Sequence, residues 1–162
     1  GGTGTATLQA PFNNRGTVEV LSGTLELREG GVSSGAFNPA SGGKVELSGG
    51  IHVLTTNATL GGAGEFRCSG GTVTNLALGA GSVTNWISDG TVYFDRPGGG
   101  TLPHLVVSGG TLDGVGGVVV AGSTLWTGGT IRSAGGVTAN GTLVVANTAQ
   151  RDLSGVLRNG GQ

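Results

Sequence analysis

Residues 69–94, SGGTVTNLALGAGSVTNWISDGTVYF, combine closely spaced glycines with the β-branched and aromatic residues that are typical of packed sheets. The whole chain of 162 residues contains 37 glycines and 4 prolines, a content at which a sequence without periodicity is expected to be disordered. The fold therefore depends on whether the glycines recur at a fixed period.

The glycines that close short SGG-like stretches recur at nearly constant spacing. Their successive separations are 19, 21, 19, 20 and 19 residues, measured between Gly31, Gly50, Gly71, Gly90, Gly110 and Gly129. A unit of about 20 residues with two or three short strands is too small to bury its own apolar face, so neighbouring units must stack. A flexible linker is the alternative, and it is disfavoured because linkers lack β-branched runs in a repeating register.

Stacked units of this size predict an all-β fold, a single parallel β-solenoid of about seven coils of 19–21 residues. We expect the coils to run from Phe12 to Gln150, within one repeat domain that spans residues 1–162. The recurring glycine suits a corner that needs a positive φ or a backbone without Cβ. In the first unit, SGTLELREGG, we expect one extra residue before the closing glycine.

Alignment on these glycines produces columns of similar residues. A threonine column and an apolar column follow the glycine, which is the alternation expected when the apolar side chains point inward. A second apolar column lies three residues before the glycine. It predicts an inward file of Leu47, Cys68, Ile87, Val107 and Trp126. Because Cys68 stands where other coils have aliphatic residues, we interpret it as a buried hydrophobic residue and not as a reactive thiol.

The charged residues also align from coil to coil. The alignment places Lys44 over Glu65 and Glu46 over Arg67, so opposite charges meet in two columns. Exposed pairs of this kind contribute only about 0.2–1 kcal/mol each, so they indicate register more than stability. Further along, the column of Glu46 becomes apolar and forms a candidate interface of Trp86, Val106 and Leu125. The alternative is a local slip of strand register that turns these three side chains inward.

The sequence carries no pattern typical of catalysis or of cofactor binding. It lacks zinc, P-loop and calcium-loop motifs. His52 and His104 occupy different offsets in different coils, so each is expected to be hydrogen-bonded or solvent-facing and not part of a shared metal site or catalytic pair. We therefore predict a protein that is not an enzyme, with no catalytic residue, no cofactor and no metal site. The aspartates also occupy four different offsets and form no paired-carboxylate groove: Asp89, Asp95, Asp113 and Asp152.

Charge and hydropathy restrict the possible partners. The formal net charge is −1 at pH 7 and no basic stripe is present, which argues against nucleic acid. No apolar stretch reaches 18 residues and no basic amphipathic helix is apparent, so membrane insertion is not predicted.

Four stretches of the chain carry a family resemblance: GAFNPASGGKVELSGG, LGGAGEFRCSGGTV, LVVSGGTLDGVGGVVVAGSTLWTGGTI and RDLSGVLRNGG. They resemble the glycine- and threonine-rich β-strand repeats of large bacterial surface and secreted proteins. The resemblance implies a parallel β-solenoid, an extracellular or cell-surface location, and a stalk, adhesin or fibre role, and it supplies no catalytic residue. Since the chain has no methionine and starts inside repeat-like sequence, we expect it to be a segment of a longer protein.

Two main functions follow from these observations. The first is a structural rod or stalk segment of a bacterial surface protein, whose partners are neighbouring repeats or copies of itself, end to end or lateral, and which can assemble into fibres. The second is an adhesin module that binds carbohydrate or another surface ligand, for which Trp86 and Tyr93 are the aromatic candidates. Ice binding ranks lower, because the third position after the glycine is irregular: Thr74, Tyr93, Asp113 and Arg132.

Overall fold

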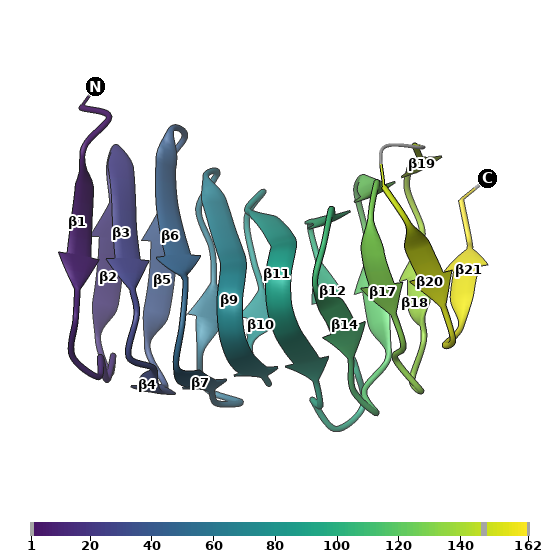
Figure 1. The fold of residues 1–162 in the computed structure, drawn as a ribbon, viewed down its shortest axis with the longest axis horizontal. Coiled ribbons are helices and arrows are strands. Elements are labelled where there is room, and N and C mark those ends of the chain that lie inside the picture. Colours follow the sequence, from purple (N-terminus) through teal and green to yellow (C-terminus); the bar gives the residue numbers. More distant parts are fainter. Residues whose placement is uncertain (1, 147–148, 162) are drawn as a thin grey trace.

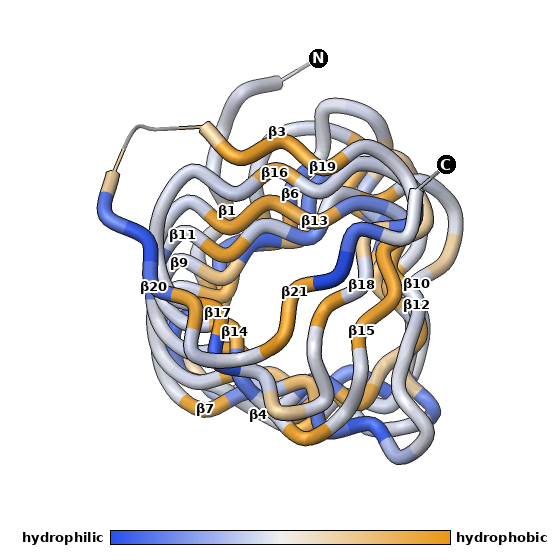
Figure 2. Tube along the Cα trace, turned by 90° about the vertical axis from the view of Figure 1, so that its right-hand side faces the viewer, coloured by the Kyte–Doolittle hydropathy of each residue, from blue (hydrophilic) through white to orange (hydrophobic). Residues whose placement is uncertain are grey.

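The computed structural model describes residues 2–146 and 149–161, and within these ranges it contains strands, turns and bends but no helix. Accordingly, this part of the chain includes no helix that could cross a membrane. The strands stack along one axis, with the two ends of the chain at opposite ends of the stack (Figure 1). Viewed along that axis, three strand-bearing faces surround a central core (Figure 2).

The first face is formed by eight strands in parallel register. In stacking order these are β1 (Thr5–Leu8), β3 (Gly23–Leu27), β6 (Gly43–Leu47), β9 (Glu65–Asn75), β11 (Thr84–Phe94), β13 (His104–Val107), β16 (Thr124–Trp126) and β19 (Leu143–Val145). The two long strands β9 and β11 bend around the corner and continue into the second face.

The second face contains the later halves of β9 and β11 and five further strands. These are β4 (Gly31–Ser33), β7 (Ile51–Leu54), β14 (Thr111–Asp113), β17 (Gly129–Ile131) and β20 (Arg151–Leu153).

The third face consists of two four-stranded parallel sheets. The first comprises β2 (Thr17–Val20), β5 (Ala36–Pro39), β8 (Thr59–Leu60) and β10 (Leu78–Gly79). The second comprises β12 (Gly100–Leu102), β15 (Val118–Val120), β18 (Val137–Ala139) and β21 (Leu157–Asn159).

The predicted parallel β-solenoid is confirmed, but the number of turns is about eight and not seven. Every strand pair is parallel, and each pairing joins one turn to the next. The count from the sequence was low because it ran only from Phe12 to Gln150. It thereby excluded β1 at one end and β20 and β21 at the other.

The core is a set of apolar files that run parallel to the axis. The predicted file from Leu47 to Trp126 is confirmed, since its members pair in register and are each at most 6 % exposed. The column behind the threonines is also buried and contains Val73, Val92, Leu112 and Ile131. Because side chains alternate across each strand, the intervening positions of the first face point outward.

The corner between the first and second faces explains the periodic glycines. At Gly71 the backbone has φ +70°, and a Cβ there would overlap the carbonyl oxygen of Gly50 in the preceding turn. An L-residue is therefore disfavoured twice, by backbone conformation and by the close approach of the turn below. A similar φ, between +61° and +77°, recurs at five of the predicted glycines: Gly50, Gly71, Gly90, Gly110 and Gly129. The sixth, Gly31, has φ +137°.

The expected extra residue in the first unit is wrong. Gly31 pairs with His52, whereas Leu27 pairs with Leu47, so this corner is one residue shorter than the corner in the next turn. Gly31 thus occupies an inward position of the second face and is not the counterpart of Gly50. The run of two glycines, Gly30 and Gly31, concealed this in the sequence, since either could be taken as the closing residue.

Candidate functional site

The three residues of the candidate interface lie in one outward row on the first face. Trp86 pairs with Val106, and Val106 pairs with Leu125, so each turn contributes one side chain. All three are half-buried and alternate with fully buried neighbours, which places them on the outside of the sheet. They line a shallow groove of about 510 Å³, which we call the apolar groove.

The outward row continues in both directions beyond these residues. Val144 pairs with Leu125 and is 44 % exposed, so it adds a fourth apolar side chain that the sequence reading missed. A further step of 19 residues along the same column would have found it. On the other side the row becomes polar, through Arg67, Glu46, Glu26 and Thr7.

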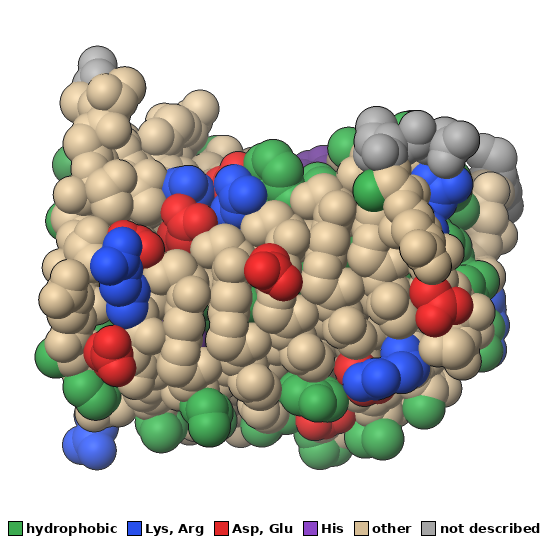
Figure 3. All heavy atoms as spheres, viewed as in Figure 1, with side chains coloured by type: hydrophobic (Ala, Val, Ile, Leu, Met, Phe, Trp, Pro, Cys, Tyr) green, Lys and Arg blue, Asp and Glu red, His purple; other side chains and the backbone are tan. Residues whose placement is uncertain are grey.

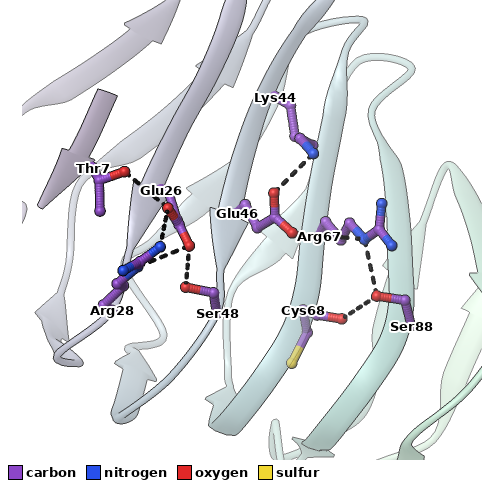
Figure 4. Close-up of polar contacts among 9 residues, drawn as sticks. All are labelled: Thr7, Glu26, Arg28, Lys44, Glu46, Ser48, Arg67, Cys68 and Ser88. Carbon is purple, nitrogen blue, oxygen red and sulfur yellow. Dashed lines mark hydrogen bonds and ion pairs between the residues drawn. The ribbon is translucent and has the colours of Figure 1, made fainter. Parts of the chain in front are cut away.

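The polar half of this row is joined to the next turn by a diagonal hydrogen-bond ladder. The serine that follows the inward file, in four successive turns, forms a hydrogen bond with the outward side chain one turn earlier; Figure 4 shows this for Ser48 and Ser88. Ser48 Oγ donates to Glu26 Oε1 at 2.8 Å, and Arg67 Nε donates to Ser88 Oγ at 2.9 Å.

The same ladder includes two further steps. Ser69 hydrogen-bonds the Glu46 carboxylate, and Trp86 Nε1 donates to Ser108 Oγ at 2.7 Å. Trp86 is thus the last rung, because Val106 and Leu125 have no side-chain polar atom. The sequence analysis assigned these serines no role, because their pairing with the row depends on the three-dimensional offset between columns.

Ion pairs strengthen the polar half. Glu26 accepts hydrogen bonds from Arg28, Ser48 and Thr7, which lower the pKa of its carboxyl to about 2. The pKa of Glu46 is also lowered on balance: burial raises it, and hydrogen bonds from Lys44 and Ser69 outweigh that. Figure 3 shows basic and acidic side chains gathered over the upper parts of β6 and β9, beside a hydrophobic group toward β11.

The predicted charge columns are confirmed in register but not in every ion pair. Lys44 pairs across strands with Glu65, and Glu46 with Arg67. Lys44 Nζ nevertheless lies 2.8 Å from Glu46 Oε2 on its own strand, and Arg67 Nε lies 3.9 Å from Glu46 Oε1. Burial raises the pKa of Glu65, whose Oε1 has no hydrogen-bond partner.

Trp86 is held by its neighbours in the row. The guanidinium of Arg67 stacks over the indole at 4.5 Å from the ring centroid, a cation–π contact. Tyr93 lies on the second face, in register with Thr74 and Asp113, so the two aromatic candidates for carbohydrate binding do not share a surface. Carbohydrate binding stays a prediction, without an aromatic platform to support it.

Cys68 lies inward, as predicted from its column. It is 4 % exposed, and its Sγ lies 3.4 Å from the carbonyl oxygen of Asp89. Burial raises the pKa of the thiol to about 11, so the thiolate needed for nucleophilic attack is scarce at neutral pH.

The two histidines lie far apart in the stack and in different surroundings. His52 is buried in the core of the second face, with Nε2 3.0 Å from the carbonyl oxygen of Gly49, and burial lowers its pKa. His104 Nδ1 lies 2.9 Å from Ser123 Oγ and also accepts the backbone N–H of Ser123 at 3.1 Å. That N–H occupies the Nδ1 lone pair, which a general base would need to accept a proton from Ser123 Oγ. We therefore interpret the contact as a hydrogen bond that fixes the turn at Ser123, and not as a catalytic dyad.

The aspartates serve as local hydrogen-bond acceptors. Asp113 forms an ion pair with Arg132 at 2.8 Å and accepts the N–H of Gly114. Asp95 accepts the N–H of Val115, and Asp89 accepts that of Gly90. Within residues 2–146 and 149–161, no three His, Cys, Asp or Glu side chains gather in a way that could hold a metal ion.

A second apolar surface, which the sequence analysis did not identify, lies on the second face. Val32 pairs with Val53 on adjacent turns, and Ile51 lies beside Val53 on the same strand. Val32 is 52 % and Ile51 is 68 % exposed, so these side chains project into solvent more than those of the apolar groove. We call Val32, Ile51 and Val53 the apolar ridge. Ile51 occupies the column that is threonine in four later turns, and this departure was the available clue.

Comparisons with protein-family models, with curated protein sequences and with solved structures found no match to this chain. The similarity to repeats of bacterial surface proteins therefore stays a prediction from the sequence, while the parallel β-solenoid rests on the structure itself.

Proposed function

We propose that this chain is a structural rod segment of a bacterial surface or secreted protein, which holds other parts of that protein at a fixed distance. The single observation that carries the proposal is the unbroken parallel stacking of the first face over about eight turns, accompanied at every junction by pairing on at least one other face. Each junction between turns is bonded on several faces at once, so the stack resists bending and its length is set by the number of turns.

The chemistry of the side chains is consistent with this role. Outward polar groups of the first face, such as those of Glu26, Arg67 and Trp86, form contacts between successive turns, and the lone thiol is buried. The location outside the cell follows from the family resemblance, and antibodies against the chain that label intact source cells would support it.

The experiment that tests the rod function changes its length by one turn. Deletion of residues 91–110 joins Gly90 to Thr111, and because Thr91 and Thr111 pair in register, the columns stay aligned. Small-angle scattering should show a folded rod that is shorter by about 4.8 Å, the spacing between paired strands.

A deletion of residues 91–100 serves as the matched control, because it removes half a turn and misaligns every later column. The rod function predicts that this variant loses cooperative unfolding while the full-turn deletion keeps it. Equal disruption by both deletions, or an unchanged maximum dimension in the full-turn variant, would contradict a length set by independent turns.

A further inference from the structure

Asp89 lies at the corner between the first and second faces, one residue before the closing glycine. In the turns on either side this position is Gly70 and Gly109, where an added Cβ would overlap the carbonyl oxygens of Ser48 and Ser88. The chain accommodates the aspartate with an irregular stretch of pairing between β9 and β11, whose register shifts on both sides of Asp89. Asp89 is exposed there, at an interruption of the regular ladder.

The fold holds the carboxyl group of Asp89 against the backbone nitrogen of the next residue. The N–H of Gly90 donates to Asp89 Oδ1 at 2.7 Å, so the carboxyl carbon lies one C–O bond beyond the atom that this nitrogen already contacts. Attack of the nitrogen on that carbon closes a five-membered ring. Glycine has no side chain to shield its nitrogen, and reacting groups that are held in contact avoid much of the entropic cost of such a step.

A second Asp–Gly pair has the same local geometry but a different partner. The N–H of Gly114 donates to Asp113 Oδ1, also at 2.7 Å. Arg132 Nη2 and Nε lie 2.8 Å and 2.9 Å from Asp113 Oδ2, whereas in the part of the chain that the structure describes no cation forms an ion pair with Asp89. The N–H of Gly114 and the guanidinium of Arg132 lower the pKa of the Asp113 carboxyl, and burial does not outweigh them. Because an ionised carboxylate resists nucleophilic attack, this ion pair protects Asp113.

We propose that the Asp89–Gly90 pair, in preference to Asp113–Gly114, is a self-modification site at which the chain converts aspartate to isoaspartate. The nitrogen of Gly90 forms a bond to the carboxyl carbon of Asp89 and loses its proton, and the carboxyl group loses its hydroxyl, which gives a succinimide and one molecule of water. Water then opens the succinimide at one of its two carbonyl carbons. Opening at the side-chain carbon restores aspartate. Opening at the main-chain carbon gives isoaspartate, in which the main chain runs through the former side chain.

This reaction changes the path of the main chain between two turns. Ile87 pairs with Cys68 and Thr91 pairs with Thr72, so both turns cross the corner with the same number of residues. Isoaspartate at position 89 adds one methylene group to this path, and the corner no longer matches its neighbours. The modification therefore weakens the stack at this junction. It goes beyond the rod function, and its absence would leave the length of the rod unaffected.

The test follows isoaspartate in the folded protein during prolonged incubation at neutral pH. Peptide mapping with electron-transfer fragmentation locates isoaspartate at each residue, and it separates isomerisation, which leaves the peptide mass unchanged, from deamidation of an Asn–Gly pair, which raises it. Isoaspartate should accumulate at Asp89 several-fold faster than at Asp113. Asp89→Glu keeps the charge and should form no isomer, because its ring would need six members. The fraction that contains isoaspartate should unfold at a lower urea concentration than the unmodified fraction.

Arg132→Gln provides the matched comparison, because it releases Asp113 and leaves Asp89 untouched. The side chain of Arg132 is 54 % exposed, so the fold tolerates the change. In this variant the rate of isomerisation at Asp113 should rise several-fold, while the rate at Asp89 stays the same.

Three results would each overturn the proposal. The first is an equal rate at Asp89 and Asp113 in the unchanged chain. The second is a rate at Asp113 that Arg132→Gln does not alter. The third is a folded chain that stays unmodified at Asp89 while a peptide of residues 86–93 forms isoaspartate under the same conditions, since the fold would then protect the pair.

Discussion

The two halves of the outward row on the first face share one backbone arrangement but differ in chemistry. From Glu26 to Trp86, each side chain hydrogen-bonds a serine of the next turn, whereas Val106, Leu125 and Val144 present apolar groups. Beneath both halves, the buried files continue in the same register. The fold is therefore determined by the inward columns and the corners, and the outward row is free to carry different surface chemistry along one rod.

The largest expected effect tests whether the two halves depend on the same glycine corner of the backbone. Gly71→Ala in the polar half and Gly110→Ala in the apolar half should each reduce the free energy of unfolding by more than about 3 kcal/mol, because each adds backbone overlap to a positive φ. The measurement is urea unfolding followed by circular dichroism.

Gly42→Ala is the control for that comparison. Gly42 has φ +84° but no atom within 4 Å of an added Cβ, so only the conformational cost of about 1–2 kcal/mol applies. If Gly42→Ala cost as much as the corner substitutions, the close approach of turns would not be the reason for the glycine column.

The next effect compares the charged beginning of the ladder with its neutral end at Trp86, beside the apolar half. Ser48→Ala removes a hydrogen bond to the charged Glu26 and should cost about 1.5 kcal/mol, whereas Ser108→Ala removes one to the neutral Trp86 and should cost about 1 kcal/mol. Ser41→Ala, at an exposed turn position, should change the unfolding free energy little. A cost at Ser41 equal to the other two would mean that the ladder adds no stability.

The polar half should also make stability depend on acid. The pKa of Glu26 is about 2 in the folded protein, well below its ordinary value of 4.5. Its contribution is therefore fully present above pH 4.5 and is lost as the pH falls toward 2. The difference in unfolding free energy between the unchanged chain and Glu26→Gln should shrink over this range. A difference that stayed constant from pH 7 to pH 2 would exclude the ionised carboxylate as its source.

Only a small effect is expected from a substitution in the buried file beneath the outward row. Cys68→Val should change the free energy of unfolding by at most about 1.5 kcal/mol, the usual limit for a swap of similar volume. In the folded protein, the buried thiol should react with a thiol reagent only as fast as the structure opens. Labelling at the rate of an unfolded control peptide would show that Cys68 is accessible.

The repeating features of the fold could be predicted from the sequence because each of them recurs in several turns. The glycine at the corner, the threonine column and the file from Leu47 to Trp126 all recur once per turn, so an error at one position is corrected by the others. The sequence analysis failed near the N-terminus, where the repeat is less regular. No SGG stretch follows β1, and the corner between Leu27 and Gly31 is one residue shorter than the corresponding corner of the next turn.

The candidate site was only partly predictable. The row of Trp86, Val106 and Leu125 follows from column spacing, and the structure places it outward. The serine ladder depends on the lateral offset between two columns, which a column alignment does not contain. The ion pair of Lys44 with Glu46 depends on the side-chain rotamer of Lys44, which the alignment does not contain either. The apolar ridge comprises residues that break the consensus of their columns, so a search for regularity passed over it.

The diagonal ladder has a directional consequence for how the chain acquires its structure. Glu26, Glu46, Arg67 and Trp86 each find their hydroxyl partner in the turn that follows. During synthesis from the N-terminus, each of these contacts can therefore form only after the following turn has folded. Because the contacting residues are only 21–23 positions apart, such sequential folding avoids the search that more distant strand pairings require. We expect truncated chains to lose protection from hydrogen exchange first in the last coil they contain.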